Sequence, residues 1–268
     1  MKEDAMQIRP VPQQRIMEKM DEYMSRRDYA GAERHLLYWL EEAKSGQDLR
    51  GQLMLRNELI GHYRKTADRD YAFENIGEAI RLLETLQFEN SVSAGTTYVN
   101  AATACSAFGD NDRAMEFFEK ARQVYESGGT EPQLLGGLYN NMALACAALG
   151  KQDSGTPAET WYAKAFGLYE KALEQMRLVP NGELEQAISY LNMADALESR
   201  DGPEAAEHQI GELLDKAYDL LQTPSVPRDG YYAFVCEKCA PAFSYYGYFQ
   251  VAEELQKSAE GIYTRGKE

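Results

Sequence analysis

Apolar and small residues recur every three or four positions through most of the chain, with polar residues between them. After Asp110, for example, Ala114, Phe118 and Ala121 are spaced so that they share one face of a helix. Matching patterns occur at Ala32 and Leu36, at Ala72, Ile76 and Ala79, at Ala165, Tyr169 and Ala172, and at Ala252 and Ala259. We therefore expect a series of amphipathic helices.

A second pattern marks the helices that precede these. Tyr98–Ala102, Tyr139–Ala143 and Tyr190–Ala194 align without gaps, and each reads Tyr-x-Asn-x-Ala. In the first two repeats a glycine, Gly109 or Gly150, follows the asparagine by nine residues and suits the left-handed turn that closes a helix. Repetition on this scale indicates stacked helix pairs.

The repeats divide the chain into six helix pairs of unequal length. Asn57 and Asn100 are 43 residues apart, whereas Asn141 and Asn192 are 51 apart, so we expect an inserted surface loop over Gln152–Pro157. The predicted fold is all-α, with an N-terminal tail over 1–11 and a single solenoid over 12–268. Its expected units are 12–45, 47–87, 91–127, 132–179, 183–223 and 229–264.

This arrangement resembles the tetratricopeptide repeat (TPR) family along nearly the whole chain. The usual unit of that family has about 34 residues. The longer units found here are similar to those of kinesin light chains, Pins-type polarity adaptors and bacterial peptide-sensing regulators, in which an asparagine also recurs in the first helices. The resemblance implies a right-handed α-α superhelix whose concave groove is lined by the first helix of each pair.

In the resembled family the asparagine of the first helix points into the groove, which transfers to Asn57, Asn100, Asn141 and Asn192. An amide both donates and accepts hydrogen bonds, so a row of amides can pair with the main chain of an extended peptide. The alternative is that these side chains bond neighbouring helices to each other. The two roles are compatible.

The same register predicts that Arg56, Arg64, Asn140 and Asp195 also face the groove. Arg56 and Arg64 could hold a ligand carboxylate through paired hydrogen bonds, or they could be two solvated arginines. Lysine is absent from the inward positions of units two to five. A lysine-rich clamp for C-terminal Glu-Glu-Val-Asp tails is therefore not expected.

The chain is acidic, with 43 Asp and Glu against 28 Lys and Arg and a formal charge of -15. This charge disfavours nucleic acid and anionic membrane surfaces as partners. The longest apolar stretch, Met142–Leu149, is far shorter than the about 20 residues that cross a bilayer. The first residues, Met1–Asp4, lack the apolar core of a signal peptide. We expect a cytoplasmic protein.

Candidate chemistry is sparse. Cys236 and Cys239 form a Cys-x-x-Cys motif without the further ligands that zinc requires. His35, His62 and His208 fall in three separate units, which gives little support to acid-base catalysis. We expect no catalytic residue, no metal and no cofactor.

Aromatic residues are unusually dense in the last unit, and two explanations remain open. They could pack in the core, or they could form an exposed patch for self-association or docking. The residues concerned are Tyr231, Tyr232, Phe234, Tyr245, Tyr246, Tyr248 and Phe249.

The leading hypothesis is a cytoplasmic, bacterial, non-catalytic scaffold that binds a protein or peptide segment in its concave groove. A peptide-sensing regulatory module, which changes superhelical shape when it captures a peptide, is the main alternative. An uncharacterised hydrolase is the alternative from another class of function.

Overall fold

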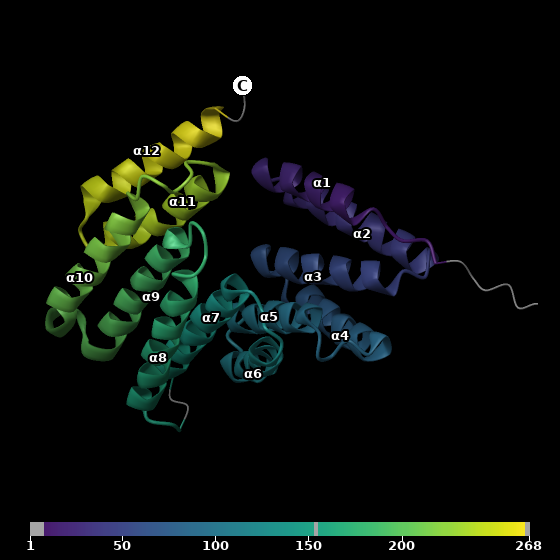
Figure 1. Cartoon of the computed structure of the whole chain (residues 1–268), viewed down its shortest axis with the longest axis horizontal. Helices are drawn as coiled ribbons and strands as arrows, with labels where there is room; N and C mark the ends of the chain where they lie inside the picture. Colours follow the sequence, from purple (N-terminus) through teal and green to yellow (C-terminus); the bar gives the residue numbers. More distant parts are fainter. Residues whose placement is uncertain (1–7, 153–154, 266–268) are drawn as a thin grey trace, which may run out of the picture. The chain divides into compact units, whose positions relative to one another are not determined.

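The computed structural model describes residues 8–152 and 155–265, which form twelve α-helices and no strand (Figure 1). The helices are α1 Gln13–Ser25, α2 Tyr29–Ser45, α3 Leu49–Lys65, α4 Arg69–Leu86, α5 Val92–Ala107, α6 Asn111–Ser127, α7 Pro132–Gly150, α8 Ala158–Met176, α9 Glu183–Asp201, α10 Pro203–Leu221, α11 Gly230–Tyr245 and α12 Phe249–Arg265. The all-α fold predicted from the sequence is confirmed.

The helices pack in consecutive antiparallel pairs. From α3 onward, each odd-numbered helix makes its most extensive contact with the even-numbered helix that follows it (Figure 1). Five of the six pairs lie within the residue ranges expected for the units, and the last pair, which ends at Arg265, extends one residue beyond the expected range 229–264. The second helices for which the sequence showed an apolar pattern are α2, α4, α6, α8 and α12.

Aspartate side chains cap several of these helices at corresponding turns. The carboxylates of Asp28 and Asp48 accept hydrogen bonds from the backbone N–H groups three residues further on, at 2.8 and 2.9 Å. Asp68 and Asp110 make the same contact at 3.5 and 3.4 Å. The caps satisfy N–H groups that have no partner within the helix, and the cap expected from the Gly109–Asp110 turn is present.

A left-handed residue precedes each of these four aspartates. Gly109 has a φ of 81°, as expected for a glycine that closes a helix. The other three positions are held by residues with a Cβ, for which the left-handed backbone conformation is higher in energy. They are Arg27, Gln47 and Ala67, with φ values of 56°, 53° and 60°.

Gly150 does not close its helix in the predicted way. The helix α7 continues through Gly150, and a Cβ at this position would lie 3.0 Å from the ring of Tyr162 in α8. The glycine therefore permits close packing of α7 on α8 rather than a left-handed turn. Of the predicted loop Gln152–Pro157, Asp153 and Ser154 lie outside the described residues.

The contacts divide the chain into two compact units, residues 1–129 and residues 130–268. In unit 1 the core includes Ile16, Leu36 and Leu59, all fully buried. In unit 2 a buried cluster that includes Leu214 and Phe243 contains side chains from all four helices α9 to α12. The expectation of a single solenoid over 12–268 stays a prediction.

Part of the predicted N-terminal tail belongs to unit 1. The N–H of Arg9 donates to the carbonyl of Gly46 at 2.9 Å. The N–H of Val11 donates to the carboxylate of Asp48 at 2.9 Å, and the Val11 side chain is buried. The tail therefore packs against the turn between α2 and α3 from Arg9 onward, while residues 1–7 lie outside the described part.

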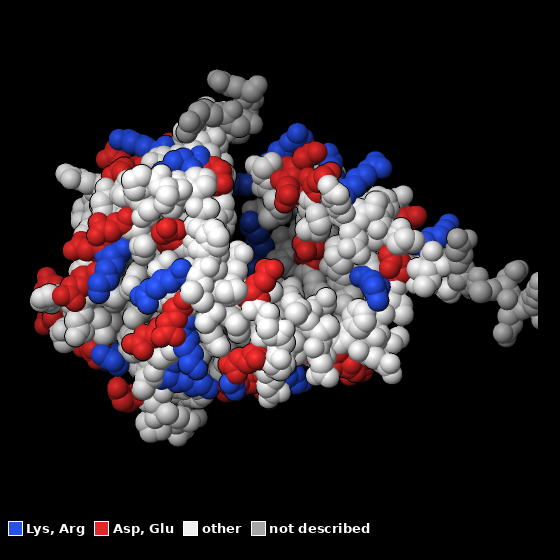
Figure 2. Space-filling model, viewed as in Figure 1, with Lys and Arg blue, Asp and Glu red and all other residues white. Residues whose placement is uncertain are grey.

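Charged side chains are spread over both units. On the face drawn in Figure 2, acidic and basic side chains are interspersed, and neither sign covers a continuous region of either unit. None of the described helices combines the length and the apolar character needed to span a lipid bilayer.

Candidate binding surface

In unit 1, the predicted asparagines join two neighbouring first helices. The amide nitrogen of Asn57 in α3 donates to the hydroxyl of Thr97 in α5 at 3.0 Å. The amide nitrogen of Asn100 in α5 donates back to the amide oxygen of Asn57 at 3.1 Å. We call Asn57, Thr97 and Asn100 the α3–α5 ladder.

Unit 2 contains an equivalent arrangement between α7 and α9. The amide oxygen of Asn140 accepts from the hydroxyl of Ser189 at 3.1 Å and from the amide nitrogen of Asn192 at 3.2 Å. We call Asn140, Ser189 and Asn192 the α7–α9 ladder. The repeat alignment singled out Asn141, but its neighbour Asn140 makes the contact between the helices.

Each ladder leaves some amide atoms without a partner among the described residues. The amide oxygens of Asn100 and Asn192 accept no hydrogen bond, and the half-buried Asn141 makes none. None of these atoms is enclosed in the protein. The bonding between helices that the sequence left open is present, and groups remain that a ligand could use.

Arg56 and Arg64, which were expected to hold a ligand carboxylate together, lie in different environments. Arg56 is buried, with 9% of its surface exposed, and donates to the amide oxygen of Asn75 in α4 at 2.8 Å. It points toward the second helix of its own pair instead of facing a ligand. Arg64 is exposed, although partial removal from water lowers the pKa of its guanidinium. The structure therefore brings no arginine pair together.

The helices α9 and α11 are joined by bonds between tyrosines and glutamates. The hydroxyl of Tyr231 donates to Glu185 at 2.9 Å. At the other end of the helices, Tyr245 and Tyr246 donate to the two carboxylate oxygens of Glu198 at 2.9 and 3.0 Å. Burial together with Glu185 raises the pKa of Tyr231 above its ordinary value, so the hydroxyl remains a donor at neutral pH.

Sequence reasoning missed these tyrosine–glutamate contacts. The partners are 46 and 47 residues apart, so no local pattern links them. The nearly equal separations at the two ends are the available signal, because they are expected when two parallel helices pair in a constant register. Asp195, which was predicted to face the groove, is exposed and pairs with Lys151 at 3.1 Å.

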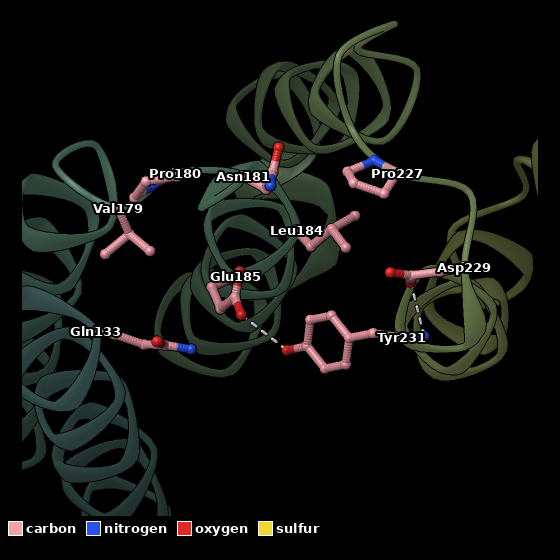
Figure 3. A pocket seen from close by; sticks show the side chains of 9 residues that line it. All are labelled: Gln133, Val179, Pro180, Asn181, Leu184, Glu185, Pro227, Asp229 and Tyr231. Atoms are coloured by element: carbon pink, nitrogen blue, oxygen red, sulfur yellow. Dashed lines mark hydrogen bonds between the residues drawn. The ribbon is translucent and has the colours of Figure 1, made fainter.

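A small pocket of about 180 Å³ lies where the first turns of α7, α9 and α11 approach one another (Figure 3). Gln133, Leu184 and Pro227 contribute to its walls. The hydrogen bond from Tyr231 to Glu185 crosses it (Figure 3). This volume is smaller than the roughly 300–1,000 Å³ typical of small-molecule sites, so the pocket is too small for most small-molecule ligands.

The thiols have no feature of a reactive or metal site. Cys236 and Cys239 are buried in α11, and burial raises the pKa of Cys239 to about 12, which keeps the thiol protonated. Cys105 and Cys146 are also buried. Within residues 8–152 and 155–265, no three metal-binding side chains lie together.

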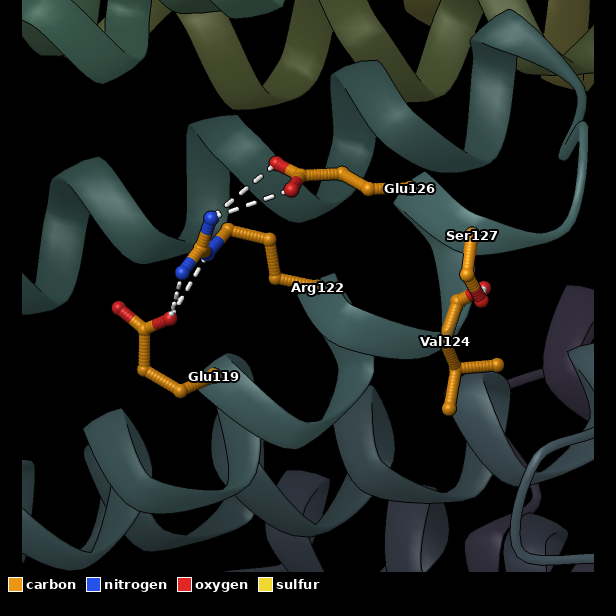
Figure 4. Close-up of polar contacts among 5 residues, drawn as sticks. All are labelled: Glu119, Arg122, Val124, Glu126 and Ser127. Atoms are coloured by element: carbon orange, nitrogen blue, oxygen red, sulfur yellow. Dashed lines mark hydrogen bonds and ion pairs between the residues drawn. The ribbon is translucent and has the colours of Figure 1, made fainter.

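Charges on a second helix are paired along that helix. Arg122 in α6 bonds Glu119 at 2.7 Å and Glu126 at 3.1 Å (Figure 4). Such partly exposed pairs contribute little to stability, about 0.3–0.5 kcal/mol each. They are typical of a solvated face and not of a ligand site.

The aromatic residues of the last unit divide between core and surface. Tyr232 and Phe243 are buried, as the packing explanation expects. Tyr231, Phe234 and Tyr245 are 47%, 48% and 71% exposed. Core packing therefore accounts for part of the cluster, another part is exposed, and a role of the exposed part in self-association or docking stays a prediction.

The fold is shared with solved helical-repeat structures. BtubC (BKLC) from P. vanneervenii matches with a TM-score of 0.56 and 20% identity, over 91% of this chain and 92% of that one. A kinesin light chain from Podosopora anserina with nearly identical TPR-like repeats matches with a TM-score of 0.52 and 17% identity, over 80% and 96%. The chain has a TPR-like fold.

Sequence comparison adds two matches that cover part of the chain. The photosystem I assembly protein Ycf3 from two strains of Prochlorococcus marinus is 30% identical over 118 residues. The match covers 44% of the TPR-like chain and 62% of the length of these relatives. No family model matches the chain.

Proposed function

We propose that this TPR-like chain is a non-catalytic scaffold that holds a segment of another protein against its first helices. The observation that carries this proposal is the set of amide groups left without a partner beside the two ladders, at Asn100, Asn141 and Asn192. Such groups can pair with the main chain of a bound segment whatever its sequence. The assembly role named for Ycf3 supports a scaffold that acts on other proteins.

The ladders would prepare this surface for binding. Because Asn57 and Asn100 are bonded across α3 and α5, the two helices present their polar groups at a fixed spacing. A fixed spacing lowers the entropy lost when a partner binds. The proposed ligand groups are Asn57, Asn100, Asn140, Asn141 and Asn192, with contributions from Arg64 and Asp195 at the margins.

A peptide-sensing module is the second candidate, and the division of the chain favours it. Unit 1 ends in the sequence at Gly129, which has a φ of 63°, a backbone conformation that residues with a Cβ rarely adopt. A sensor would change its dimensions on binding a peptide, whereas a rigid scaffold would not. Small-angle scattering with and without a bound segment separates the two.

Replacing Asn141 with alanine tests the scaffold proposal directly. Its side chain makes no hydrogen bond among the described residues, so we expect unchanged helicity and thermal stability. Capture of partner proteins from a native lysate, quantified by mass spectrometry, should fall several-fold. The double variant Asn100→Ala, Asn141→Ala should reduce it further.

The matched control is Gln123→Ala on the exposed face of α6, which removes an amide from a second helix. It should leave capture unchanged. If Asn141→Ala and the double variant capture the same proteins at the same level as the parent chain, the proposed role of the asparagines is wrong.

A further inference from the structure

A stripe of exposed residues runs along one face of α11. Tyr231, Phe234, Lys238, Pro241 and Tyr245 recur at spacings of three or four and are all exposed, so they share one side of the helix. At the N-terminal end the rings of Tyr231 and Phe234 are stacked, with centroids 6.2 Å apart. At the C-terminal end Tyr245 contacts Tyr246 edge to face, at 5.0 Å.

Each aromatic pair lies beside a carboxylate of α9. Tyr231 bonds Glu185, and Tyr245 and Tyr246 bond Glu198. Neither carboxylate forms an ion pair with a Lys or Arg of the described chain. We call Glu185, Tyr231 and Phe234 the first aromatic–acid cluster, and Glu198, Tyr245 and Tyr246 the second.

This combination of groups selects for cations. The face of an aromatic ring attracts a guanidinium or ammonium group, and a carboxylate that accepts only tyrosine hydroxyls retains lone pairs for a charge-assisted bond. The net charge of -15 adds a long-range attraction for basic segments and repels acidic ones. An acidic peptide would therefore be disfavoured at both clusters.

The spacing of the clusters limits the ligand further. Glu185 and Glu198 are about 20 Å apart along α9, at about 1.5 Å per residue. An extended peptide covers this distance in about six residues. Lys238 lies between the clusters on the exposed stripe, and its charge disfavours a segment that is basic throughout.

We propose that the α9–α11 surface binds an extended segment of a partner protein that carries two arginines or lysines about six residues apart, with neutral residues between them. Each basic side chain occupies one aromatic–acid cluster. This inference rests on the proposed scaffold function and names the class of segment that unit 2 recognises.

The test uses the full chain and synthetic ten-residue peptides labelled for fluorescence anisotropy. The probe has arginines at positions 2 and 8 in a Gly-Ser-Ala background. One comparison peptide has arginines at positions 4 and 6, and another has glutamates at positions 2 and 8. We expect the probe to bind about tenfold more tightly than either comparison peptide, since each cluster adds cation–π and charge-assisted contacts.

Matched variants assign the binding to the clusters. Glu185→Gln with Glu198→Gln removes two negative charges from the clusters and should weaken probe binding about tenfold. Glu170→Gln with Glu174→Gln removes the same charge from exposed positions of α8 and should have little effect. Phe234→Leu keeps the apolar bulk but removes the ring, and it should weaken binding while circular dichroism remains unchanged.

The outcomes separate this inference from the scaffold proposal. Equal binding of all three peptides, or equal losses from the α9 and α8 double variants, would overturn the inference. If the probe fails to bind while Asn141→Ala still reduces partner capture, only the inference is wrong. If neither effect is seen, the scaffold proposal fails as well.

Discussion

Two buried tyrosines differ in whether their hydroxyls have a partner. Tyr125 in α6 is 2% exposed and its hydroxyl lies 3.1 Å from that of Thr96. Tyr169 in α8 is fully buried and its hydroxyl has no partner among the described residues. Burial raises the pKa of Tyr169 above its ordinary value, so it carries a neutral polar group that is unpaired in the core.

Replacing each tyrosine by phenylalanine should therefore have opposite effects. Tyr169→Phe removes a buried group without a hydrogen bond and should raise the free energy of unfolding by about 1 kcal/mol. Tyr125→Phe removes the hydrogen bond to Thr96, whose exposed hydroxyl keeps its bond to the carbonyl of Val92 at 3.2 Å, and should lower it by up to about 1 kcal/mol. Urea denaturation of the two variants measures both, and a loss of stability in Tyr169→Phe would reveal a partner for its hydroxyl.

Glu58 in α3 predicts a pH-dependent stability. Removal from water, with a further contribution from Asp21, raises the pKa of Glu58. A carboxyl with a raised pKa in the folded state binds its proton more tightly there, so it disfavours folding once the pH exceeds the ordinary glutamate range. Glu58→Gln should stabilise the protein at pH 7 and lose this advantage as the pH falls toward 4.

The control for this prediction is Glu74→Gln on the exposed face of α4. Thermal unfolding midpoints of both variants, measured between pH 4 and 8, give the comparison. A gain at Glu58 that does not change with pH would show that the raised pKa is not its cause.

At the scale of the helices, the turns before the aspartate caps differ in backbone cost. Ala67 and Gly109 occupy equivalent turns with φ values of 60° and 81°, but only the glycine adopts this region freely. A Cβ on Gly109 would meet no atom within 4 Å, so a substitution there reports the backbone preference without a clash.

Exchanging the residue types at these turns should shift stability in opposite directions. Ala67→Gly should raise the free energy of unfolding by about 0.5–1 kcal/mol, and Gly109→Ala should lower it by about 1 kcal/mol. Chemical denaturation provides the measurement. Changes of the same sign would mean that the two turns are not equivalent.

At the scale of the whole molecule, the sequence predicted the series of helices well because similar patterns of apolar residues recur from one repeat to the next. Five second helices carry an apolar periodicity and three first helices carry the Tyr-x-Asn-x-Ala pattern, and these repeats together indicated the series of helix pairs. The prediction that Gly150 closes its helix was wrong. A glycine suits a left-handed turn but also permits close contact between helices, and Gly150 permits the contact with Tyr162.

The candidate site was predictable only as a region. Neighbouring residues of a helix point about 100° apart, so a small error of register exchanges Asn141 for Asn140 in a ladder and turns Arg56 toward Asn75. The contacts of α9 with α11 depend on residues more than forty positions apart. Such details require the packed structure.

The docked N-terminal segment has a practical consequence for producing the protein. Asp48 uses one carboxylate oxygen to cap α3 and the other to hold the N–H of Val11. An affinity tag attached upstream of Ile8 leaves both bonds intact. A shortened chain beginning at Gln13 would lose the second bond and uncover the apolar site of Val11, so it should be more prone to aggregation during purification.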